Sequence, residues 1–66
     1  MIGPKEKPQV ELIGQDGDAF AIMGTVSKAL RKAGADSEYI KQYTDAATSG
    51  DYDNLLQVTM EYVDII

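Results

Sequence analysis

The sequence predicts a mainly α fold, a small three-helix domain with one short N-terminal β-strand. Three segments repeat apolar residues at helical spacing, and each follows an aspartate or serine that suits a helix N-cap. At 66 residues the chain has room for one domain at most. We therefore expect a single helical domain over residues 9–66. Residues 1–8, which hold both prolines, are expected to form a flexible tail.

The strand is expected at residues 9–13, where Val10 and Leu12 alternate with polar residues. A lone strand leaves its backbone groups unpaired, so it needs a partner strand. Within this chain the only other candidate is the segment 62–66, which could equally complete a helix. A strand from a second copy is the alternative.

The first helix is expected from residue 19 to about residue 33. Asp18 is a natural N-cap whose carboxylate can accept from the N–H of Ala21, and Gly34 is the expected stop. The apolar stripe of this helix consists of Ala19, Ile22, Met23, Val26, Leu30 and Ala33. Gly24 lies mid-helix on a second face with Phe20 and Ser27. There it permits close approach of another backbone, from a second copy or from this chain's own strand or third helix.

The second helix is expected to begin after Asp36 or Ser37 and to run to about residue 48. Its stripe is Tyr39, Ile40, Tyr43, Ala46 and Ala47. The third is expected to begin after Asp51 and to end near residue 62 or 63. Its stripe is Tyr52, Leu55, Leu56, Thr59 and Val63, widened by Val58 and Tyr62. Two other helices cannot cover so wide an arc, so we expect apolar surface on the first and third helices to form a homo-oligomer, most simply a dimer.

The composition argues against most enzymes, because the chain has no Cys, His or Trp. Disulfides and ordinary zinc sites are excluded, and no imidazole or thiol can activate a serine or threonine. The aspartate pairs, Asp16 with Asp18 and Asp51 with Asp53, lack the further ligands of a calcium loop. We expect no cofactor, no metal and no catalytic residue, with carboxylate or tyrosine chemistry as the residual alternative.

The charge is −5 and unevenly spread, since residues 42–66 contain five acidic residues and no Lys or Arg. A negative field favours basic partners and disfavours nucleic acid. No apolar run approaches the roughly 20 residues of a membrane span, and residues 1–5 show no signal-peptide pattern. We expect a soluble, cytoplasmic protein without membrane contact.

Two sets of residues are candidates for binding. The first would contact a partner protein, and it comprises Tyr39, Tyr43, Asp51, Asp53, Glu61 and Asp64. Tyrosines are enriched in interfaces, although they also occur as ordinary core residues. The second would hold an anion such as a nucleotide between neighbouring copies, and it comprises Gly14, Gln15, Asp16, Gly17, Lys28 and Arg31. A glycine-containing turn before a helix presents backbone N–H groups to an anion, but the same turn is explained by helix capping.

Residues 10–24 (VELIGQDGDAFAIMG) and 46–56 (AATSGDYDNLL) resemble a group of short, acidic, uncharacterised proteins of bacteria and their phages or mobile elements. The resemblance covers most of residues 9–64. It implies a domain of phage or mobile-element type and implies no catalytic residue. The leading functional hypothesis is a non-enzymatic protein that binds a host protein as an inhibitor or regulator. The alternative is a protein that sequesters a nucleotide signal at its oligomer interface.

Overall fold

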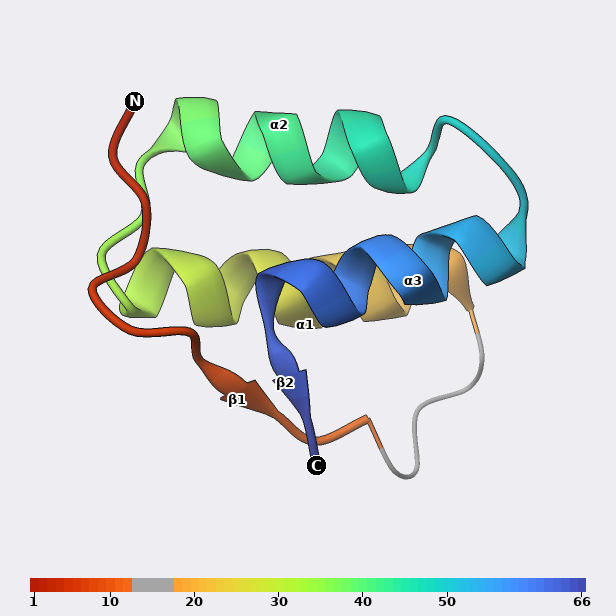
Figure 1. Cartoon of the computed structure of the whole chain (residues 1–66), viewed down its shortest axis with the longest axis horizontal. Helices are drawn as coiled ribbons and strands as arrows, with labels where there is room; N and C mark the ends of the chain where they lie inside the picture. Colours follow the sequence, from red (N-terminus) through yellow and green to blue (C-terminus); the bar gives the residue numbers. More distant parts are fainter. Residues whose placement is uncertain (13–17) are drawn as a thin grey trace.

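The computed structural model describes residues 1–12 and 18–66 (Figure 1). The elements are β1 (Gln9–Val10), α1 (Ala19–Lys32), α2 (Ser37–Ala47), α3 (Tyr52–Tyr62) and β2 (Asp64–Ile65). The mainly helical class with three helices is confirmed for the described residues. The sequence prediction of one strand is incomplete, because a second strand follows α3 and pairs with the first.

Each helix begins after an aspartate whose carboxylate accepts a hydrogen bond from a backbone N–H in the first turn. These caps are Asp18, Asp36 and Asp51. Asp18 accepts from the N–H of Phe20 at 2.9 Å, not from that of Ala21 as predicted. Both N–H groups belong to the first turn, where no helical carbonyl is available to them, so either can bond to the cap.

The ends of α1 and α2 follow from local backbone chemistry. α1 ends at Lys32, and Gly34 adopts a φ of +107°, a conformation that only glycine reaches without strain. α2 ends one residue before Thr48, whose N–H still bonds to the carbonyl of Thr44. Both helices therefore stop within a residue of the predicted ends.

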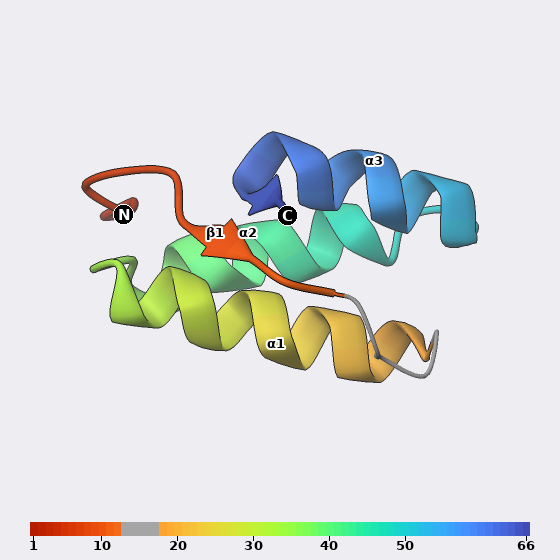
Figure 2. The same cartoon turned by 90° about the horizontal axis from the view of Figure 1, so that it is seen from below.

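The core forms where α1, α2, α3 and β1 meet, and the three helices run alongside one another (Figure 2). The buried apolar residues are Val10, Ile22, Val26, Leu30, Ala35, Ile40, Tyr43, Ala47, Leu55, Val58 and Val63. Each of the three predicted stripes contributes to this set. None of the helices among the described residues is long and apolar enough to cross a membrane.

The wide apolar arc of α3 is largely covered within one chain. Leu55 and Val58 are buried, and Val63 is fully buried just after the helix. The other two helices are not the only cover, because β1 also packs Val10 into the same core. On α3 the large apolar side chains left exposed are Tyr52 and Met60. Self-association therefore stays a prediction that needs a surface other than this arc.

The two strands pair in parallel, with Gln9 opposite Asp64 and Val10 opposite Ile65. The N–H of Asp64 bonds to the carbonyl of Pro8 at 2.9 Å, and the N–H of Ile66 to that of Val10 at 3.0 Å. Parallel strands need a long crossover connection, and the three helices supply it. The open question about residues 62–66 is thereby resolved: the helix ends at Tyr62 and a strand follows.

Residues 1–8 have defined contacts in the structure, where the sequence predicted a flexible tail. The N–H of Lys5 bonds to the carbonyl of Ala33 at 3.1 Å. The N–H of Asp36 bonds to the carbonyl of Ile2 at 2.9 Å, and the Asp36 carboxylate accepts from the N–H of Ile2 at 2.8 Å. The turn between α1 and α2 offers these partners to the N-terminal segment, which the sequence pattern does not reveal.

Candidate protein-binding surface

Two adjoining hollows lie on the surface formed by α1, α2 and the start of α3. The first, called here the α1–α2 groove, has a volume of about 380 Å³ and is lined by Phe20, Met23, Gly24, Ser27, Thr44, Asp45 and Thr48. The second, called here the α3 hollow, has a volume of about 280 Å³ and is lined by Ala19, Met23, Ala47, Thr48, Gly50, Asp51, Tyr52 and Leu55. Met23 and Thr48 line both, so the two hollows are neighbours.

An exposed aromatic side chain lies at each hollow. Phe20 in the α1–α2 groove is 81% exposed, and Tyr52 in the α3 hollow is 44% exposed. Large exposed apolar side chains beside a concave surface are typical of binding sites. Gathered on one side of so small a domain, they make this surface the strongest candidate for contact with another molecule.

Gly24 provides open space in the α1–α2 groove. A Cβ atom built there would meet no described atom within 4 Å. The alternative that Gly24 accommodates this chain's own strand or third helix is therefore wrong for the residues that the structure describes. A glycine that costs about 1 kcal/mol of helix stability relative to Ala is thus not required by packing within the chain.

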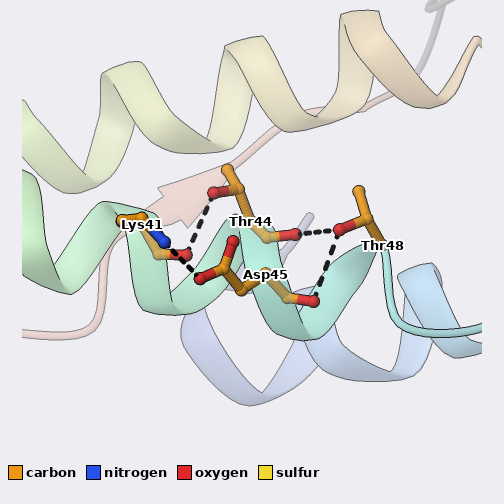
Figure 3. Close-up of polar contacts among 4 residues, drawn as sticks. All are labelled: Lys41, Thr44, Asp45 and Thr48. Carbon is orange, nitrogen blue, oxygen red and sulfur yellow. Dashed lines mark hydrogen bonds and ion pairs between the residues drawn. The ribbon is translucent and has the colours of Figure 1, made fainter.

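The α2 side of the groove is less polar than its sequence suggests (Figure 3). The Thr44 hydroxyl donates to the carbonyl of Lys41 at 3.1 Å, and the Thr48 hydroxyl donates to the carbonyl of Thr44 at 2.7 Å. Their hydroxyls bond back to their own helix, so the methyl groups are the free parts of these side chains. Asp45 forms an ion pair with Lys41 at 2.8 Å, and the hydrogen bond between them raises the pKa of the Lys41 ammonium.

The four predicted acidic residues are spread from the start of α3 to β2. Asp51 and Asp53 flank Tyr52 at the start of α3 and are exposed. Glu61 lies near the end of the same helix, about 12 Å from Asp53 along the axis at 1.5 Å per residue. Asp64 lies on β2 and forms an ion pair with Lys7 at 3.5 Å.

The predicted tyrosine anchors are placed differently from each other. Tyr43 is fully buried, and its hydroxyl shares a hydrogen bond of 2.7 Å with that of Thr59. Burial raises the pKa of Tyr43, partly offset by the hydrogen bond with Thr59. The expectation that Tyr43 anchors a partner is therefore wrong in a single chain, because its helical face points into the core. Tyr39 is half-buried, with its ring edge-on to that of Tyr62 at 5.5 Å between centroids.

Tyr52 is the exposed tyrosine among the four, and the predicted anchors Tyr39 and Tyr43 did not include it. The sequence does carry a signal for it. Tyr52 is the first residue after an aspartate N-cap and has an aspartate on each side, and first-turn positions of this kind commonly face solvent. Tyr52 instead belongs to the predicted apolar stripe of the third helix, because it lies at helical spacing from Leu55 and Leu56.

The predicted anion-binding set is described only in part. Lys28 and Arg31 are exposed on α1, while Gly14, Gln15, Asp16 and Gly17 lie outside the described residues. In residues 1–12 and 18–66 there is no group of three or more acidic side chains that could hold a metal ion. A further hollow of about 620 Å³ lies beside the N-terminal segment and includes the Lys7–Asp64 ion pair.

Comparison with known proteins gives no matching family model, no similar curated protein and no similar solved structure. Proposals about function therefore start from the residues of this chain and from the resemblance noted in its sequence.

Proposed function

We propose that this chain is a non-enzymatic protein-binding module that acts as a homo-oligomer, and that the α3 hollow receives a basic segment of its partner. The observation that carries the proposal is the position of Tyr52. This tyrosine is 44% exposed, lines a hollow with the apolar side chains of Met23 and Leu55, and lies between two exposed carboxylates.

The chemistry of this surface suits a segment that combines apolar and basic residues. A tyrosine offers a large apolar ring and a polar tip, which is why tyrosines are enriched at interface centres. Asp51 and Asp53 supply negative charge beside it, and residues 42–66 contain no Lys or Arg to neutralise that charge locally. Complementary charge mainly increases the association rate and selects against acidic partners.

The biological role follows from the resemblance to short acidic proteins of phages and mobile elements. In that setting a small binding module without catalytic groups fits an inhibitor or regulator of a host system. The partner in this proposal is a host protein that presents a basic segment.

The test must separate binding from helix capping, because the Asp51 carboxylate accepts from the N–H of Asn54 at 3.0 Å. Asp51 is therefore left unchanged. The informative variant is Tyr52→Ser with Asp53→Asn. Its matched control is Met60→Ser with Glu61→Gln, which removes an exposed apolar side chain and a carboxylate from the other end of α3. The three proteins are immobilised, incubated with bacterial host lysate at low and moderate salt, and compared by mass spectrometry.

The proposal expects at least one protein to be retained by the wild type and by the control, lost from the Tyr52 variant and weakened by salt. Identical retained sets for all three proteins, or no retained protein at either salt concentration, would contradict it. The nucleotide-binding hypothesis makes a different prediction. A nucleotide ligand would raise the melting temperature of the isolated protein by mass action.

A further inference from the structure

The outward face of α1 carries an unusual series of residues. Phe20, Gly24, Ser27 and Arg31 follow one another at spacings of four, three and four, so they share one side of the helix. Phe20 is 81% exposed, and Gly24 has open space around it. A protruding aromatic ring and a position without a side chain thus lie one turn apart on the same helix.

This arrangement is complementary to itself. A two-fold symmetric contact requires that residue i of one copy touch residue j of the other, and that j touch i in return. If a second α1 lies antiparallel on the first, the Phe20 ring of each copy can lie over Gly24 of the other. The ring would enter the α1–α2 groove, where Met23 and the methyl groups of Thr44 and Thr48 supply apolar contact.

Charge along this surface favours the same antiparallel arrangement. At the start of α1 lies the exposed carboxylate of Asp18, whereas Asp45 on the α2 side of the groove is already paired with Lys41. At its end lie the exposed side chains of Lys28 and Arg31. With Phe20 of each copy on Gly24 of the other, the antiparallel contact is centred on residue 22, so Asp18 of one copy lies level with residue 26 of the other, about 3 Å along the axis from Lys28. The helix dipoles oppose one another favourably in this arrangement as well.

We propose that the α1 face is a self-association surface whose occupant is a second copy of this chain, with the two α1 helices antiparallel about a two-fold axis. Phe20 of each copy packs on Gly24 of the other. The inference rests on the homo-oligomer of the proposed function and assigns it an interface. It does not use Tyr52, although Met23 and Thr48 line the α3 hollow as well as the α1–α2 groove, so the second copy would border the hollow that the partner enters.

The decisive variants are Phe20→Ala and Gly24→Gln. Neither is expected to disturb the isolated fold, because Phe20 is mostly exposed and a Cβ atom at Gly24 has open space around it. Met60→Ala is the matched control, since it removes an exposed apolar side chain from α3. Sedimentation equilibrium and light scattering over a wide dilution series give the dissociation constants, and thermal melting by circular dichroism reports on folding.

We expect the wild type and Met60→Ala to form dimers of equal affinity. Phe20→Ala and Gly24→Gln should each raise the dissociation constant at least about tenfold, equivalent to about 1.4 kcal/mol, and still melt cooperatively. Gly24→Gln should melt at or above the wild-type monomer temperature, because glycine is the weaker helix former. Lys28→Glu should also weaken the dimer, and added salt should reduce the difference.

Three results would overturn the inference, and they are distinguishable. A dimer that both variants leave unchanged keeps the proposed homo-oligomer and rejects this interface. A wild type that stays monomeric throughout the series rejects the interface and the homo-oligomer together. A monomeric wild type whose capture of a host protein is abolished by Phe20→Ala assigns the α1 face to a foreign partner. None of these results bears on the separate capture test of Tyr52.

Discussion

The buried hydrogen bond between Tyr43 and Thr59 should make a measurable contribution to stability. Both side chains are fully buried, and their hydroxyl oxygens are 2.7 Å apart. Tyr43→Phe keeps the ring, which packs edge-on against Tyr62 at 5.1 Å, and removes only the phenolic oxygen. The Thr59 hydroxyl then loses its partner in a water-free position.

The expected loss is about 1–3 kcal/mol, the usual cost of leaving a buried polar group unsatisfied. Thr59 lies in a helix, so its hydroxyl can turn back to a carbonyl of the preceding turn, which moves the expectation to about 1–2 kcal/mol. A domain of 66 residues has a total stability of roughly 3–10 kcal/mol. The variant should therefore lose a substantial part of it and melt roughly 4–16 °C lower.

The assay is urea unfolding followed by circular dichroism for four proteins: wild type, Tyr43→Phe, Thr59→Val and the double variant. Each single variant should be destabilised, and the double variant should be less destabilised than the sum of the two. Replacing both partners by apolar groups of the same shape leaves no unsatisfied hydroxyl. Additive losses, or a Tyr43→Phe variant as stable as the wild type, would refute the reasoning.

Three further predictions concern pH and backbone conformation. Burial raises the pKa of Tyr43 above 10.0. The neutral phenol therefore contributes its full stabilisation below pH 10, and this contribution is lost as the pH rises further. Above pH 10 the urea midpoint should fall less steeply for Tyr43→Phe than for the wild type. The hydrogen bond from the N–H of Tyr39 lowers the pKa of Asp36 below 3.8. The stabilisation from the Asp36 carboxylate is therefore present above pH 3.8 and is lost as the pH falls further. An NMR titration that gives this carboxyl a pKa of 3.8 or more would contradict the prediction. Gly34→Ala should lower the free energy of unfolding by about 1–2 kcal/mol because residue 34 has a positive φ. Gly24→Ala should raise that of the monomer by about 1 kcal/mol, because alanine is the better helix former. Melting temperatures that shift by the same amount in the same direction would contradict this pair of predictions.

The helices were predictable because their signals are local. An aspartate cap, a helical stripe and a terminal glycine act within a few residues of one another, so the starts at Asp36 and Asp51 and the stop at Gly34 can be read from sequence. Even the detail that differed, Asp18 bonding to Phe20 rather than Ala21, moves the partner by one residue only.

The exposure of side chains was harder to predict, because it depends on segments distant in the sequence. Tyr43 and Tyr39 are one helical turn apart, yet only Tyr43 is fully buried. The width of the arc on α3 suggested uncovered surface, while the short strand β1 supplied cover that helical periodicity cannot show. Tyr52 had a local signal for exposure in its two flanking aspartates, but its place beside Met23 in the α3 hollow depends on how α3 packs against α1.

Pairing of β1 with β2 joins residue 9 to residue 64, and this has a consequence for the order of folding. Closing so long a loop costs chain entropy that only a few strand hydrogen bonds offset directly. We therefore expect the helices to form and pack first and the strands to pair last. In hydrogen exchange, the amides of Asp64 and Ile66 should exchange faster than those of the helical interior. A protein fused to residue 66 would therefore disturb the pairing of β1 with β2 before it disturbs the helices.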